Sequence, residues 1–268
     1  MRKKKAHGTC HICLKKGKLS FEHVPPRSAF NDRPLVLKKV DWLRQGGPEI
    51  APGRRIQQRG AGGYTLCERC NNQTGIWYGA AYAEWAEQGL EAIDRSGGWP
   101  GIYYRFNIYP LRVLKQIVCM FFSANRPGFA RRYPDLVDFV LSKDRRYIQP
   151  DVRIYALCTK SRLMRQTGQQ LFGILRKGVY PLSEITFPPF GYVMFLGCKT
   201  HDPRLYDISF FGEYAYREQR TVPLPLPILP VVTPYPGDYR TPLELVQTIQ
   251  ENIAHEREQK LRSLGSHG

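Results

Sequence analysis

The chain has no apolar run long enough to span a membrane, and no basic amphipathic helix leads it. The basic residues Arg2, Lys3, Lys4 and Lys5 are not followed by the apolar stretch that a signal peptide needs. Internal repeats are also lacking, which argues against a solenoid. These absences favour a globular protein that does not use a membrane.

Cysteines are few and odd in number, seven in 268 residues, so a disulfide framework is not expected. Cys119, Cys158 and Cys198 are isolated among apolar residues, which is typical of buried thiols. The other four cysteines form two C-x2-C pairs, which are called clips below. This usage indicates a reducing compartment, and we expect the protein to be cytoplasmic.

Acidic residues are scarce: 23 Asp and Glu against 40 Lys and Arg, a formal net charge of +17. Most of this excess lies in the first 75 residues. Such charge favours a nucleic acid partner, because basic clusters attract phosphate backbones without reading bases. DNA is expected more than RNA, although the charge does not distinguish them. The alternative is a solvated basic face. The residues predicted to contact phosphates are Lys38, Lys39, Arg54 and Arg55.

Two C-x2-C clips, Cys10 with Cys13 and Cys67 with Cys70, predict a structural zinc site. Four thiolates close a zinc tetrahedron and leave no position for substrate. Within the first clip, His11 is then expected to be a solvent-facing spacer and not a ligand. The alternatives are a zinc ribbon that only shapes a fold, and coincidental buried thiols.

Glu22, His23 and Asn71 adjoin these clips and have the chemistry of a second, catalytic metal site. Glu22 offers a carboxylate oxygen and Asn71 an amide oxygen, which suit a hard cation such as Mg²⁺ or Mn²⁺. His23 titrates near neutral pH and is a natural general base. Neighbours on a regular strand point to opposite faces, so we expect the strand to end near His23, where two prolines follow. The alternatives are a surface acid, a turn histidine and a helix N-cap.

Two stretches carry these residues, Glu-His-Val-Pro-Pro-Arg-Ser at 22–28 and Leu-Cys-Glu-Arg-Cys-Asn-Asn-Gln-Thr-Gly at 66–75. Together they resemble the HNH, or ββα-metal, family of endonucleases, in the branch with a four-cysteine zinc site. The resemblance covers about residues 6 to 85. It implies that Glu22 and Asn71 hold the catalytic cation and that His23 activates water.

The resemblance has one departure: Gly62 stands where the family has a middle asparagine that braces the base histidine. Asn31, Gln57, Gln58 or a backbone carbonyl remain as candidates for that role.

The fold class predicted is α+β, with an HNH domain at 1–96 and an α+β domain of unassigned role at 102–268, divided at the glycine-rich break 97–101. Helices are expected at 109–124, 134–142 and 241–261, with 221–236 extended and proline-rich. Strands are expected at 152–158, 170–175, 192–196 and 207–216.

The function predicted is a metal-dependent HNH-type endonuclease that hydrolyses phosphodiester bonds. Two alternatives stay open. One is an inactive zinc-ribbon protein that binds nucleic acid, and the other is an effector subunit whose C-terminal half docks on a partner protein.

Overall fold

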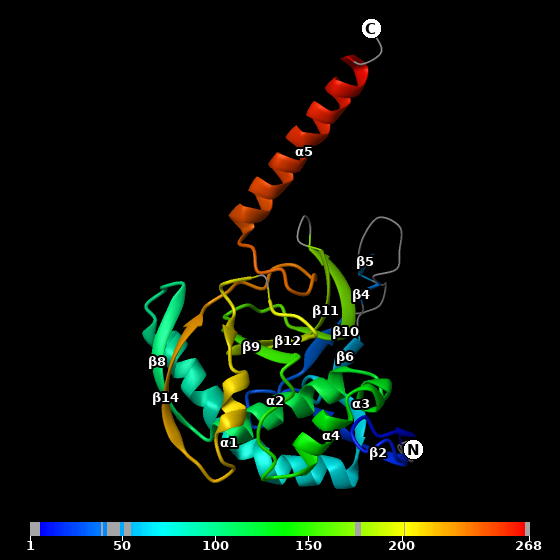
Figure 1. Cartoon of the computed structure of the whole chain (residues 1–268), viewed down its shortest axis with the longest axis vertical. Coiled ribbons are helices and arrows are strands. Elements are labelled where there is room, and N and C mark those ends of the chain that lie inside the picture. The colour runs from blue at the N-terminus through cyan, green and yellow to red at the C-terminus, as the bar shows by residue number, and fades with distance from the viewer. Residues whose placement is uncertain are drawn as a thin grey trace.

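The computed structural model describes residues 6–38, 40–41, 49–50, 55–174, 178–200 and 202–265. The fold is mixed α and β (Figure 1). This agrees with the predicted α+β class. Four cysteines form a cluster near the N-terminus.

The N-terminal part is built on a three-stranded antiparallel sheet. Its order is β1 (His7–Thr9), β2 (Lys16–His23) and β7 (Gly62–Cys67). The long helix α1 (Glu68–Arg95) begins directly after β7, so strand, strand and helix form one continuous unit. Strand β2 ends at His23, as predicted from the two prolines that follow. Two short ribbons branch from the segment between β2 and β7: β3 (Leu35–Leu37) with β6 (Arg55–Gln57), and β4 (Val40–Asp41) with β5 (Glu49–Ile50).

The second part contains three further helices and a larger sheet. Helix α2 (Pro110–Ala124) packs against α1, with α3 (Gly128–Arg132) and α4 (Pro134–Leu141) beside it. The five-stranded sheet has the order β10 (Arg165–Ile174), β11 (Gly178–Phe187), β12 (Phe190–Leu196), β9 (Val152–Cys158) and β13 (Tyr206–Asp207). A separate ribbon pairs β8 (Gly101–Ile108) with β14 (Arg220–Pro227).

One hydrophobic core lies on both sides of the expected boundary at 97–101. The same buried cluster includes Cys10 and Leu66 of the first part and Phe122, Ile154 and Leu224 of the second. Helix α2 is at its centre, since nearly all its side chains are buried, including the polar Lys115 and Gln116. The break at 97–101 is therefore a turn that leads from α1 into β8, and the core continues across it.

One expectation about local structure is wrong. The segment 207–216 is not one strand: β13 ends at Asp207, and a 3-10 helix, η1 (Ser209–Glu213), follows. The Asp207 carboxylate accepts a hydrogen bond from the Ser209 backbone, which turns the chain. Strands β8 and β11 were not expected at all. The other predicted helices and strands are present, with β10 beginning earlier than expected.

The C-terminal helix α5 (Pro242–Gly265) extends away from the rest of the molecule (Figure 1). A capping box starts this helix: Thr241 Oγ1 accepts from the Glu244 amide, and the Glu244 carboxylate accepts from the Thr241 amide. Its side chains Leu243, Val246, Ile249 and Ile253 are exposed. None of the helices in the described ranges is long and apolar enough to cross a lipid bilayer.

Candidate functional site

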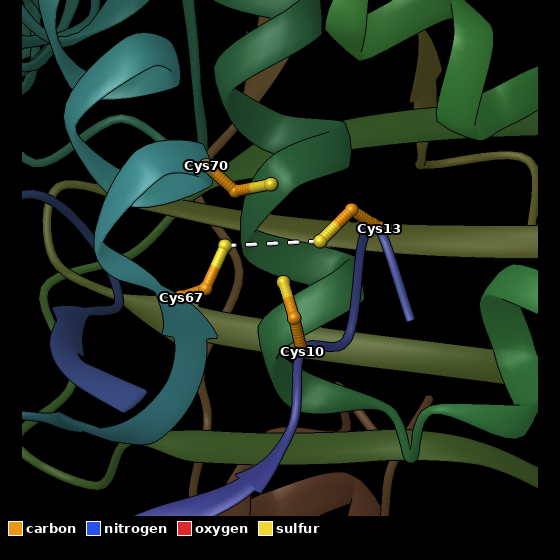
Figure 2. Close-up of side chains that lie close together, drawn as sticks. All are labelled: Cys10, Cys13, Cys67 and Cys70. Carbon is orange, nitrogen blue, oxygen red and sulfur yellow. Dashed lines mark hydrogen bonds between the residues drawn. The ribbon is translucent and has the colours of Figure 1, made fainter. Parts of the chain in front are cut away.

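The four clip cysteines gather at the start of α1. Cys10 and Cys13 come from the turn between β1 and β2, Cys67 is the N-cap of α1 and Cys70 lies in its first turn. Figure 2 shows their side chains pointing toward one another. All four sulfurs lie within 4.8 Å of one another, and those of Cys13 and Cys67 are 3.7 Å apart. A zinc tetrahedron with Zn–S near 2.3 Å has sulfur–sulfur edges of about 3.8 Å. The cluster can therefore hold a metal ion such as zinc.

The crowding of these thiols separates their pKa values. A hydrogen bond from Cys70 lowers the pKa of Cys10 to about 4, and the same bond raises the pKa of the Cys70 thiol. Burial raises the pKa of Cys13. Four thiolates at this spacing repel one another, so a cation is needed before all four can be deprotonated together.

His11 lies outside the ligand cluster, but it does not face solvent as expected. Its ring nitrogen Nδ1 is 3.2 Å from the backbone oxygen of Phe122, at the end of α2. Burial lowers the pKa of its imidazole. The adjacent clip is also held by a backbone bond from His11 to Thr65. His11 therefore fastens the cysteine turn to α2.

Glu22, His23 and Asn71 line one pocket, with a volume of about 920 Å³, between the end of β2 and one face of α1. The strand and helix that carry them are the two elements that the cysteine cluster joins. Other lining residues are Arg27 and Asp32 from the loop after β2, Glu84 and Glu87 from α1, and Gln116 from α2.

Glu22 is the most deeply buried acid of this pocket, with only 7% of its surface exposed. Burial raises the pKa of its carboxyl to about 8. Within the described part of the chain, no hydrogen bond or ion pair compensates this carboxylate. A buried, uncompensated carboxylate is a fitting ligand for a cation, which would replace the proton.

Asn71 lies one turn inside α1 and is not its N-cap, which is Cys67. Its Nδ2 donates to Ser20 Oγ at 3.0 Å and to the backbone oxygen of Phe21 at 3.2 Å. Both bonds reach back to β2, so they fix the amide against the strand that ends in Glu22 and His23. Both bonds are donated by the amide nitrogen, so neither of them uses the side-chain oxygen of Asn71.

His23 lies near the backbone of Arg59, which favours the charged form of its imidazole. Its ring packs edge-on against Phe21 with centroids 4.9 Å apart. Burial lowers the pKa of the imidazole, and the nearby charges of Arg27 and Arg59 lower it further. These effects favour the neutral form of the ring, which can accept a proton.

Gly62 departs from the family pattern for a steric reason. A Cβ at this position would lie 2.0 Å from the backbone oxygen of Glu22, and the backbone has φ of +145°. No side chain fits there. The two strands meet so closely because Gly62 pairs with His23 in the ladder.

Asn31 braces the loops around His23 instead. Its Nδ2 donates to the backbone oxygens of Pro25 and Ala61, at 2.7 and 2.8 Å, and its Oδ1 accepts from the Ala61 amide at 2.6 Å. The side chain is 1% exposed. Asn31 thus ties the residues after β2 to those before β7, on either side of His23. Gln57 braces the turn before β7 by donating to Gly60 and Gly62, whereas Gln58 is exposed.

The residues predicted to contact phosphates are only partly described. Lys38 and Arg55 are exposed and lie at the same end of the β3–β6 ribbon, since Leu37 pairs with Arg55. Lys39 and Arg54 lie outside the described residues. Sequence reasoning missed Arg27 and Arg59, the two guanidiniums nearest His23. Arg27 lies within the 22–28 stretch, and that position was the one available signal for it.

In comparisons with known proteins, no family model, no curated protein and no solved structure matches this chain. The likeness to HNH endonucleases therefore stays a hypothesis based on the residues themselves.

Proposed function

We propose that this protein is a metal-dependent endonuclease of the HNH type, which hydrolyses phosphodiester bonds in nucleic acid, with DNA the expected substrate. One observation carries the proposal: Glu22, His23 and Asn71 line a single pocket, on a strand and a helix joined by the cysteine cluster. A carboxylate, an amide oxygen and a neutral imidazole are the groups that metal-assisted hydrolysis needs.

In this proposal the two metal positions have different tasks. The four cysteines would hold a structural zinc that fixes β2 against α1. Glu22 and Asn71 would hold Mg²⁺ or Mn²⁺ in the pocket through oxygen ligands, and such a cation supplies charge stabilisation for the phosphate and the leaving oxygen.

His23 would act as the general base. His23 lines the pocket and its pKa is lowered by burial, so its neutral imidazole can take a proton from the attacking water. The lowered pKa keeps the imidazole neutral in the resting protein. Arg27 lines the same pocket and can position a phosphate by charge.

The preference for a nucleic acid substrate rests on charge. The chain carries +17, and Lys38 and Arg55 are exposed on a ribbon that branches from the same loop region as the pocket. Incubation with supercoiled plasmid and with single-stranded RNA, in Mg²⁺, Mn²⁺ or EDTA, tests the proposal. Metal-dependent cutting of either polymer supports it, and the polymer that is cut identifies the substrate.

A second candidate function is nucleic-acid binding without cleavage. The burial of Glu22 favours it, since a carboxyl with a pKa of about 8 is largely protonated at neutral pH unless a cation replaces the proton. Salt-dependent binding without cutting in any of the three conditions would support this candidate.

A protein partner for the C-terminal half stays a prediction as well. The exposed aliphatic side chains of α5 bear on it, and copurification with and without α5 tests it.

A further inference from the structure

Gln116 is a buried amide that the proposed chemistry does not yet use. It lies in the second turn of α2, and 2% of its surface is exposed. Its Oε1 has no hydrogen-bond partner within the described residues. A buried carbonyl without a partner costs about 1–3 kcal/mol, and a side chain that brings this cost needs an explanation.

The surroundings of Gln116 place it at the candidate site. It lines the same pocket as Glu22, His23 and Asn71, although it comes from a different part of the chain. One turn further along α2, Cys119 is buried, which raises the pKa of its thiol, and the nearby Glu22 charge raises that pKa further. The face of α2 that carries Gln116 and Cys119 is therefore turned toward Glu22.

Lys115, the buried polar residue next to Gln116, has hydrogen-bond partners that account for its burial. Lys115 is also fully buried, but its Nζ donates to the backbone oxygens of Phe139 and Ser142 at 2.6 and 2.5 Å. It closes the end of α4. Lys115 has a structural task, whereas Gln116 has a buried oxygen without a partner and lines a pocket that also contains a carboxylate and an amide.

We propose that Gln116 is a third protein ligand for the divalent cation of this pocket, through its Oε1. This rests on the proposed function, which places Mg²⁺ or Mn²⁺ at Glu22 and Asn71. One carboxylate and two neutral amide oxygens suit a hard cation that keeps several of its waters. Soft thiolates are not part of this set, which separates it from the zinc cluster.

The proposed ligands then come from both sides of the turn at 97–101 in the sequence. Glu22 and Asn71 belong to the strand–strand–helix unit, and Gln116 belongs to the buried helix that packs against it. The unit that resembles the HNH pattern would thus be incomplete without α2, and the rest of the chain would take part in cation binding.

Binding of Mn²⁺ to the zinc-loaded full chain tests this, with free Mn²⁺ measured by electron paramagnetic resonance. The variants are Gln116→Leu, which removes the oxygen at similar volume, Gln116→Met as a second variant, and Gln116→Glu. Gln88→Leu on α1 is the matched control, because Gln88 lies outside the pocket and its amide bonds to the backbone of Glu84 and Asn107.

We expect Gln116→Leu and Gln116→Met to weaken Mn²⁺ binding about tenfold or more, the scale seen when groups that support a metal are removed. Gln116→Glu should strengthen binding, and Gln88→Leu should leave it unchanged. The thermal midpoint of the Mn²⁺-free variants should stay level or rise, since the orphaned carbonyl is gone. Weaker binding at unchanged stability separates a ligand from a packing residue.

Equal Mn²⁺ affinity in wild type, Gln116→Leu and Gln116→Met would overturn the inference and leave the proposed function in place. Failure of the wild type itself to bind Mn²⁺ would overturn both. A variant that does not fold is replaced by the other of the pair, since leucine and methionine fill the site differently.

Discussion

The segment from β1 to β7 and the segment from β8 to β14 are stabilised in different ways. In the second, whole elements are buried: every residue of β12, and nearly every residue of α2. In the first, buried apolar side chains are sparse, and the loops are held by four cysteines and by the hydrogen bonds of Asn31. Of the residues proposed for catalysis, Glu22 and His23 lie in the first segment, and Asn71 lies in α1, which follows it directly. The cysteine cluster and the hydrogen bonds of Asn31 thus adjoin the pocket, and the apolar core packs against the helix that lines it.

The largest expected effect follows from breaking the cysteine cluster. Cys70→Ser should abolish zinc binding and unfold the first segment, because structural zinc contributes about 10–16 kcal/mol of folding free energy in zinc fingers. The apolar core should protect the second segment, so limited proteolysis should cut between residues 14 and 66 first. Elemental analysis gives the zinc content. Cys198→Ser, outside the cluster, is the control and should keep one zinc per chain. A full zinc content in Cys70→Ser would refute the cluster's role.

The second segment should respond instead to the loss of a buried ion pair. Arg165 and Glu184 are 2.8 Å apart and almost fully buried, and burial raises the pKa of Glu184. Arg165→Met leaves Glu184 without its partner, which should cost about 3–5 kcal/mol. Urea unfolding measures this. Arg240→Met removes a more exposed pair with Asp238 and should cost about 0–1 kcal/mol. Similar losses of unfolding free energy in the two variants would show that the buried pair stabilises the protein no more than the exposed pair.

Within the first segment, the brace at Asn31 should have a smaller effect. Asn31→Ala orphans the buried amide and carbonyls around Ala61, at a cost of about 1–3 kcal/mol for such a group. It should also lower cleavage, since these loops hold His23. Gln58→Ala is the control, because Gln58 is exposed and adjacent to the same turn. Urea unfolding and cleavage rates are measured for both variants. An Asn31→Ala protein as stable as the control would show that the hydrogen bonds of Asn31 do not stabilise these loops.

The smallest structural effect is expected from neutralising the basic surface. Replacing Lys38, Lys39, Arg54 and Arg55 by alanine should leave zinc content and stability unchanged. The slope of log affinity against log salt should flatten by about 0.9 for each phosphate that the protein no longer neutralises. A charge-matched control replaces four basic residues of the second segment: Arg131, Arg132, Lys160 and Arg162. Equal slopes in the two variants would mean that the first four are a solvated face.

Local patterns in the sequence predicted local structure well. The cysteine clips gather as expected, because each pair is set by a short spacing on one turn. Strand β9 has the predicted bounds, because its apolar run lies between turn residues. The segment 207–216 was predicted as one strand. The hydrogen bond from the Ser209 backbone to the Asp207 carboxylate turns the chain there, and the pattern of hydrophobic residues does not reveal it.

Features that depend on distant residues could not be read from the sequence. Nothing local indicates that a Cβ at position 62 would meet the backbone of Glu22. The role of Asn31 was one of four alternatives, and only the pairing of β2 with β7 brings Pro25 and Ala61 to its side chain. Gln116 lies in a run of apolar residues with no motif, and only the packing of α2 on α1 brings it to the pocket.

Cleavage of supercoiled plasmid by wild type and His23→Ala, side by side, tests the central claim most directly. We expect the wild type to cut in Mg²⁺ or Mn²⁺ and not in EDTA, and His23→Ala to be about 10²–10⁴ times slower, because a general base contributes on this scale. Zinc content and DNA affinity should be the same in both proteins. A wild type that cuts neither DNA nor RNA with either cation, or a His23→Ala variant that cuts as fast as the wild type, would contradict the account.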